Sequence, residues 1–123
     1  MRFGTLSLVA FVLACQNDTV IEKQENVAPS VLIVSHSEGM IALDGYSERI
    51  RATVSDEDHD FDELSVAWYV DETLMCDWAT VSPGGDASCD IQFFEGNSSV
   101  IVQVSDPVGA GAIHEIAVNV EPT

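Results

Sequence analysis

Apolar and polar residues alternate along most of this chain, with a period of two that begins after Pro29. In the segment 49–55, for example, Ile50, Ala52 and Val54 fall on one face of an extended strand. Such alternation is typical of strands with one buried face, and no stretch beyond the N-terminal segment shows a convincing helical stripe. The chain is therefore predicted to be all-β. The expected strands are residues 30–35, 40–43, 49–55, 64–71, 88–93, 100–104 and 112–120.

Turn-forming residues separate these segments at short intervals. Gly, Pro, Asp and Asn gather between the expected strands, as in 82–85, 95–97 and 106–109. About seven short strands in about 95 residues, with frequent turns, are typical of an antiparallel β-sandwich. Trp68 is expected in its core. The sequence thus predicts a single sandwich domain over residues 29–123.

The first fourteen residues have the character of an export signal. Residues 1–14 join a basic start to a short apolar run, and polar residues follow from Gln16. Val12-Leu13-Ala14-Cys15 resembles the lipobox of bacterial lipoproteins, which implies that Cys15 carries the lipid. The alternatives are an ordinary signal peptide with an incidental cysteine, or a transmembrane anchor. Spanning a membrane takes about 20 apolar residues, and this run is shorter.

The residues after Cys15 extend this resemblance to location. Gln16 differs from the aspartate that marks inner-membrane retention in the enterobacterial rule. The resemblance therefore implies an exported outer-membrane lipoprotein, at the periplasmic face or the cell surface. Residues 15–28 are polar and lack a sustained period, so we expect the lipidated cysteine to begin a flexible tether. The membrane is then a partner, reached through the lipid anchor.

Two further cysteines, Cys76 and Cys89, form an even pair if Cys15 is lipidated. In an exported chain such a pair predicts a disulfide. A closed loop of this size stabilises the fold by about 3 kcal/mol in the chain-entropy estimate. The alternatives are two free thiols or a metal site, although no CxxC spacing favours zinc.

The chain is strongly acidic, with 21 Asp and Glu residues against 4 Lys and Arg and a formal net charge of −17. Binding to nucleic acid requires clustered basic residues, so nucleic acid is not an expected partner. The acidity favours cations or basic partners, or else reflects only the solubility of an exported protein.

Two short motifs suggest a family. The segments Ala52-Thr53-Val54-Ser55-Asp56 and Val104-Ser105-Asp106-Pro107-Val108-Gly109 end two expected strands. They are similar to signatures of the bacterial Ig-like, PKD-like and cadherin-like modules of surface proteins. The resemblance covers residues 29–121 and implies an Ig-like β-sandwich. One departure from the PKD pattern is that Tyr69-Val70-Asp71-Glu72 follows the strand tryptophan, Trp68.

The densest polar feature is the acidic run 56–63. Asp56, Asp58 and Asp60 alternate along it and present hard oxygen ligands, which suit Ca²⁺. The run is not an EF-hand, because the required glycine and glutamate are missing. In an Ig-like sandwich the loop carrying Asp106 lies at the same end, so these four aspartates are the candidate Ca²⁺ ligands. The alternative is a solvated acidic loop.

The sequence contains no arrangement of residues typical of an enzyme. His36, His59 and His114 are far apart in the sequence, and nothing places a nucleophile beside them. No Gly-x-Ser-x-Gly motif occurs, and apart from the candidate Ca²⁺ ligands the sequence has no cofactor motif. Trp78, in the segment between the paired cysteines, is a candidate contact for a protein or glycan ligand, with packing against the sandwich edge as the alternative.

These features predict a lipid-anchored binding or adhesion module of the envelope or cell surface, and not an enzyme. The alternatives are a passive spacer or accessory subunit of a surface complex, and a protein inhibitor of a hydrolase.

Overall fold

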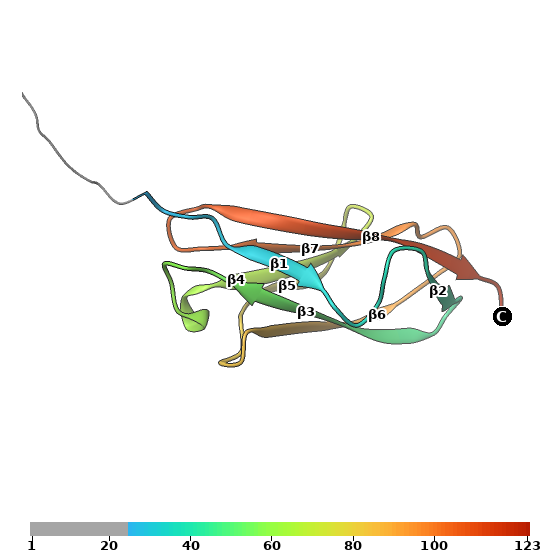
Figure 1. Ribbon diagram of the computed structural model, residues 1–123. Coiled ribbons are helices and arrows are strands. Elements are labelled where there is room, and N and C mark those ends of the chain that lie inside the picture. Colours follow the sequence, from blue (N-terminus) through green and yellow to red (C-terminus); the bar gives the residue numbers. More distant parts are fainter. Residues whose placement is uncertain (1–24) are drawn as a thin grey trace, which may run out of the picture.

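The computed structural model describes residues 25–123, which form eight strands and one short 3-10 helix (Figure 1). The expected signal peptide and Cys15 lie outside the described residues. Within residues 25–123, no helix is long and apolar enough to cross a membrane. The elements are β1 (Ser30–Ile33), β2 (Met40–Leu43), β3 (Ser47–Ser55), the 3-10 helix η2 (Phe61–Glu63), β4 (Ser65–Val70), β5 (Thr73–Thr80), β6 (Asp86–Gln92), β7 (Ser99–Ser105) and β8 (Gly111–Glu121).

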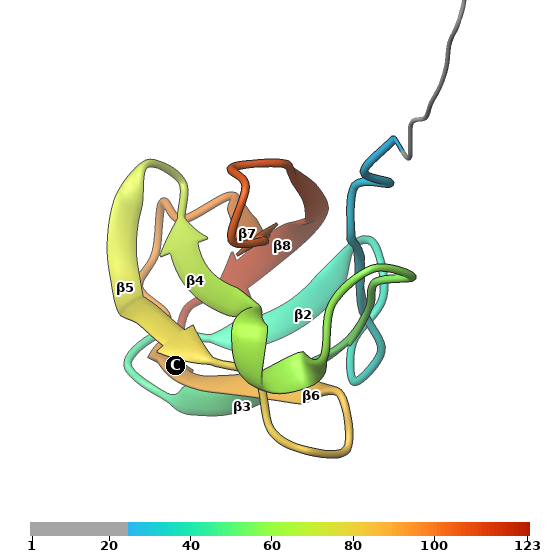
Figure 2. The same cartoon turned by 90° about the vertical axis from the view of Figure 1, so that its left-hand side faces the viewer.

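The strands form two packed sheets, which confirms the predicted β-sandwich. One sheet has the order β1-β3-β6 and the other the order β2-β8-β7-β4-β5. The ladders are antiparallel, except that β2 pairs with β8 in parallel. β1 and β2 follow one another in the chain but belong to opposite sheets. In Figure 2, β5 lies at the outer side of the sandwich, opposite the segment that leads into β1.

Alternate residues of both sheets fill the space between them. Trp68 on β4 is only 2% exposed, and its neighbours across the strands are Cys76 on β5 and Val102 on β7. The predicted inward set of β3, namely Ile50, Ala52 and Val54, is buried as well. Burial of apolar area at about 25 cal/mol per Å² is the main favourable contribution to folding. The period of two seen in the sequence therefore corresponds to this core.

β5 is the strand that the sequence pattern missed. Seven of its eight residues are exposed and one, Cys76, is half-buried, so its sequence Thr-Leu-Met-Cys-Asp-Trp-Ala-Thr shows no alternation. It pairs with β4 alone, and the register between the two strands shifts twice, around Trp68. An edge strand with irregular pairing has little buried surface to shape its sequence. The segment around Trp78, expected as a loop, is thus extended.

The predicted disulfide between Cys76 and Cys89 is confirmed. It joins β5, at the edge of the five-stranded sheet, to β6, at the edge of the three-stranded sheet. On the other side of the sandwich, the Ile33 N–H donates a hydrogen bond of 2.9 Å to Nδ1 of His114 on β8. The two sheets are therefore joined by a disulfide on one side of the sandwich and by a hydrogen bond from β1 to β8 on the other.

Candidate functional site

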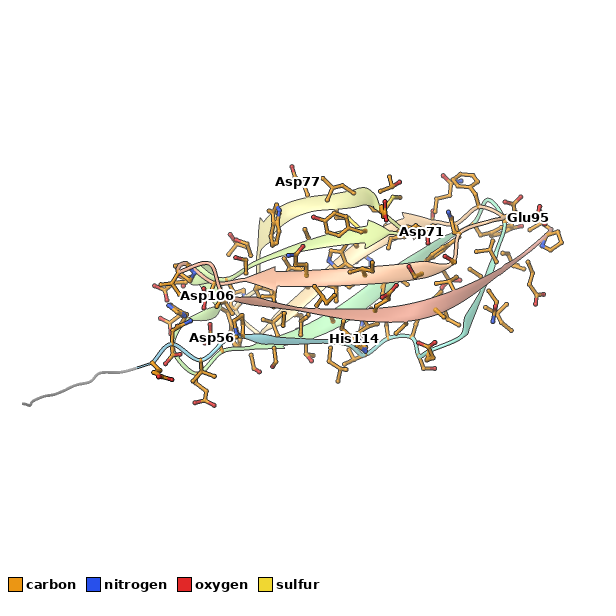
Figure 3. All side chains as sticks on the ribbon, turned by 90° about the horizontal axis from the view of Figure 1, so that it is seen from above. Asp56, Asp71, Asp77, Glu95, Asp106 and His114 are labelled. Atoms are coloured by element: carbon orange, nitrogen blue, oxygen red, sulfur yellow. A yellow bond between two sulfur atoms is a disulfide. The ribbon has the colours of Figure 1, made fainter. Side chains whose placement is uncertain are left out.

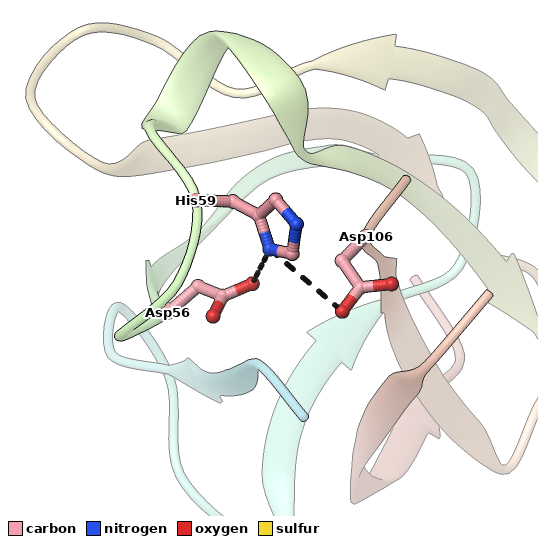
Figure 4. Close-up of side chains that lie close together, drawn as sticks. All are labelled: Asp56, His59 and Asp106. Carbon is pink, nitrogen blue, oxygen red and sulfur yellow. Dashed lines mark hydrogen bonds and ion pairs between the residues drawn. The ribbon is translucent and has the colours of Figure 1, made fainter. Parts of the chain in front are cut away.

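Three polar side chains meet at one end of the sandwich. Asp56 follows β3 and Asp106 follows β7, and both lie at the same end of the sandwich (Figure 3). His59 lies in the loop before η2. Nδ1 of His59 lies 3.0 Å from Oδ2 of Asp56 and 3.9 Å from Oδ2 of Asp106 (Figure 4). Neither carboxylate has exposed surface, and the imidazole side chain is 15% exposed. We call these three residues the Asp-His-Asp cluster.

Hydrogen bonds to the backbone hold Asp106 in this buried position. Its Oδ1 accepts hydrogen bonds from the backbone N–H groups of Val108, at 3.0 Å, and Ala110, at 2.9 Å. Its Oδ2 accepts a hydrogen bond of 2.9 Å from the side-chain amide Nδ2 of Asn26. Burial on its own raises the pKa of Asp106. The three hydrogen bonds and the nearby His59 outweigh burial, so the pKa lies below its ordinary value of 3.8.

The loop after β3 is ordered in a similar way. Oδ1 of Asp56 accepts the Asp58 N–H at 2.9 Å, an Asx-type turn that the Asp-Glu-Asp sequence favours. Oδ2 of Asp58 accepts the Val27 N–H at 2.6 Å. Together with the bond from Asn26 to Asp106, this contact fixes the segment before β1 against the cluster. The first described residues thus belong to the site.

The two carboxylates favour the charged form of His59. The hydrogen bond to Asp56 is the largest influence and raises the pKa of the imidazole above its ordinary value of 6.5. Burial opposes this rise, and the negative charges of Asp56, Asp106 and Glu63 add to it. When His59 is protonated, its imidazolium is a counter-ion to two buried carboxylates.

The structure brings together two of the four predicted Ca²⁺ ligands, Asp56 and Asp106. Among residues 25–123, their ligand atoms and Nδ1 of His59 are the one group of three found within 4.8 Å of one another. Asp58 is engaged by the backbone, and Asp60 is exposed outside the cluster. His59 was not among the predicted ligands, although its position three residues after Asp56 could have indicated that the two side chains lie close together. Ca²⁺ takes six to eight oxygen ligands, so this donor set covers only part of its coordination.

A hollow of about 700 Å³ adjoins the cluster. Its wall includes Asp56, His59 and Asp60, with Phe61 and Pro83 as apolar surface. The Phe61 ring also fills the space at Gly85, where an added Cβ would lie 2.8 Å from a ring carbon. The lining of the hollow thus combines carboxylates with an aromatic ring, and both attract cations.

The charge of His59 should make stability depend on pH. Because its pKa is raised on folding, its contribution is fully present below about pH 6.5 and is lost as the pH rises through the folded-state value. We expect the melting temperature to fall between about pH 6 and about pH 9, and His59→Gln to lower it at about pH 6 and to flatten the profile. A His59→Gln profile parallel to that of the wild type would contradict this role.

Trp78 lies at a second, separate position, on the edge strand β5. Its side chain is 42% exposed, and neither it nor Asp77 has a partner residue on β4. The Trp78 N–H donates to Oδ1 of Asp77 at 2.7 Å. Leu74 and Met75 on the same strand are 44% and 38% exposed. Trp78 is therefore not a core residue, and it is a candidate contact residue.

Comparison with known proteins supports the fold. No family model matches the sequence, and no curated protein matches it. Among solved structures, fibronectin(III)-like modules of Clostridium thermocellum CbhA are similar, with a TM-score of 0.62 at 20% identity over 76% of this chain and 99% of that chain. Titin M4 is similar with a TM-score of 0.55 at 14% identity, over 80% of this chain and 100% of that chain. A chimeric titin Z1Z2 is similar with a TM-score of 0.55 at 16% identity, over 81% of this chain and 100% of that chain. These likenesses show an Ig-like β-sandwich fold.

Proposed function

We propose that this protein is a lipid-anchored binding module of the bacterial envelope or cell surface and has no catalytic activity. The lipobox-like sequence before Cys15 supports export and anchoring at the outer membrane. The Ig-like fold supports a binding or structural role. The partner is a protein or a glycan, since the net charge of −17 disfavours nucleic acid.

The observation that carries this proposal is the exposed apolar surface of β5. Leu74, Met75 and Trp78 lie on one edge strand and are each more than a third exposed. Exposed tryptophan is unusual on a surface without a partner and is enriched among the residues that dominate binding energy. A passive spacer gains nothing from such a surface, whereas an accessory subunit would use it to contact its complex. An inhibitor of a hydrolase would also use it, so that alternative shares the same site.

The anchor and the proposed binding surface are compatible in space. Asn26 and Val27 are bonded to Asp106 and Asp58, at the cluster end of the sandwich. An anchor at Cys15 would therefore turn this end toward the membrane. β5 extends along the side of the sandwich (Figure 2) and would remain accessible.

Replacing Trp78 with alanine tests the binding role. We expect Trp78→Ala to weaken capture of a partner from envelope extracts by at least about tenfold, because a buried tryptophan at an interface contributes about 2 kcal/mol or more. The measurement is the amount of partner that the full chain captures from envelope extracts, quantified after cross-linking. Val108→Ala is the matched control, since Val108 is 66% exposed but follows Asp106 at the cluster end. Equal capture by wild type and Trp78→Ala would contradict the proposal.

We also propose that Ca²⁺ stabilises the acidic end of the domain, held by Asp56 and Asp106. Asp58 and Asp60 would complete its coordination by leaving the positions they have in this structure. The support is the pair of buried carboxylates, whose charge His59 balances. Because the ion and the imidazolium would compete, millimolar Ca²⁺ should raise the melting temperature by several degrees at about pH 8.5 and less at about pH 6. Identical melting curves with Ca²⁺ and with chelator at both pH values would contradict this.

A further inference from the structure

We infer that β5 accepts an extended, basic segment of a partner protein as an additional strand of the five-stranded sheet. The inference rests on the proposed binding role of β5 and specifies the chemistry of the partner. It follows from the position of the strand, from its support and from the distribution of charge.

The position of β5 leaves one side of its backbone without a neighbouring strand. It ends the sheet order β2-β8-β7-β4-β5, and none of its eight residues is buried. Asp77 and Trp78 have no partner residues on β4, and the Trp78 N–H donates instead to Oδ1 of Asp77 at 2.7 Å. Open N–H and C=O groups along an edge strand are the template for strand addition, which supplies affinity through main-chain hydrogen bonds.

The support of β5 makes this edge a rigid template. The Cys76–Cys89 disulfide fixes its middle to β6 of the opposite sheet, and the β4 ladder continues on both sides of that point. β5 therefore needs little ordering when a strand is added, which lowers the entropic cost of binding.

The distribution of charge identifies the partner as basic. Arg49 and Arg51 are the only Lys or Arg residues in the range 25–123, and both lie on β3 in the other sheet. Arg49 is also paired with Asp90 at 2.8 Å. β5 and the turn before it carry Asp71, Glu72 and Asp77, and no Lys or Arg lies on the five-stranded sheet as the structure describes it.

This charge distribution disfavours a second copy of the chain as the added strand. Pairing two β5 strands would bring the acidic side chains of both copies together, in molecules that each carry a formal charge of −17. A basic strand would instead place Lys or Arg beside Asp77, while its apolar residues contact Leu74, Met75 or Trp78.

The test uses the full chain and two synthetic peptides as long as β5, one alternating threonine with lysine and one alternating threonine with glutamate. Amide hydrogen exchange of residues 73–80 is the readout. We expect the lysine peptide to slow exchange in this range at least about fivefold at saturation, and the glutamate peptide to have no effect. Asp77→Lys should weaken binding of the lysine peptide about tenfold. Glu115→Lys, an equal charge change at an exposed position on β8, should weaken it much less.

Three outcomes would overturn the inference. The first is that the lysine peptide slows amide exchange in another edge strand or in none. The second is that Asp77→Lys and Glu115→Lys weaken peptide binding equally. The third is that the chain dimerises through β5 in the absence of peptide. If Trp78→Ala abolishes partner capture while residues 73–80 gain no protection, strand addition is wrong and the binding role stands. If Trp78→Ala has no effect on capture while the lysine peptide protects β5, the proposed function alone fails.

Discussion

Replacing Trp68 with alanine is expected to destabilise the domain by about 3–5 kcal/mol, the range for removing a large aromatic side chain from a core. Trp68 is 2% exposed and lies between Cys76 and Val102 in the five-stranded sheet. The cavity left behind would lie beside the Cys76–Cys89 disulfide. Since domains of this size have a total stability of about 5–15 kcal/mol, this single change removes a large share of it.

Urea denaturation of wild type and Trp68→Ala measures this effect. The exposed tryptophan provides the matched control, because Trp78→Ala removes the same side chain from a position that is 42% exposed. We expect the control to cost less than about 1 kcal/mol. If Trp68→Ala leaves too little folded protein, the milder Trp68→Phe should still cost about 1–2 kcal/mol. Similar losses for Trp68→Ala and Trp78→Ala would show that Trp68 is not the centre of the core.

Removing the Cys76–Cys89 disulfide is expected to cost about 3 kcal/mol, because the bond closes a loop with a sequence separation of 13. The bond joins the free edges of the two sheets. Its loss should therefore affect β5 first, since β5 would be held by its irregular ladder with β4 alone. We expect faster amide exchange in residues 73–80 than in β7 after reduction.

The comparison is between the wild type with and without reductant and a Cys76→Ala/Cys89→Ala variant. The variant should match the reduced wild type in its urea midpoint and should not respond to reductant. Equal midpoints for the oxidised and reduced wild type would contradict the expected stabilisation. An unchanged exchange rate in β5 would show that the β4 ladder is sufficient to hold the strand.

The sequence pattern was reliable where burial and local chemistry act together. Ile50, Ala52 and Val54 alternate because one face of β3 is in the core. The pairing of Cys76 with Cys89 was predicted on the expectation that the chain is exported and that Cys15 is lipidated, which leaves two cysteines to pair. In both cases the physical cause, burial of one strand face or pairing of two thiols, acts on the same residues that form the pattern in the sequence.

Features set by distant parts of the chain could not be predicted in this way. β5 is defined by its position beside β4, and its own residues carry no burial signal. The Asp-His-Asp cluster forms because β3 and β7 finish at the same end of the sandwich. This brings Asp56 and His59 close to Asp106, although Asp56 and Asp106 are 50 residues apart in the sequence. The parallel pairing of β2 with β8 likewise depends on the chain changing sheets after β1.

That parallel pairing determines how the domain would respond to mechanical force. The described chain enters at one end of the sandwich and leaves at the other (Figure 1). Tension between these two points pulls β2 and β8 in opposite directions along their common axis, so the ladder from Met40–Val118 to Leu43–Glu121 is loaded in shear. Its hydrogen bonds then share the load instead of opening one after another. Pulling the domain between residues 25 and 123 would measure this resistance, and a break that begins elsewhere would show that the ladder does not limit it.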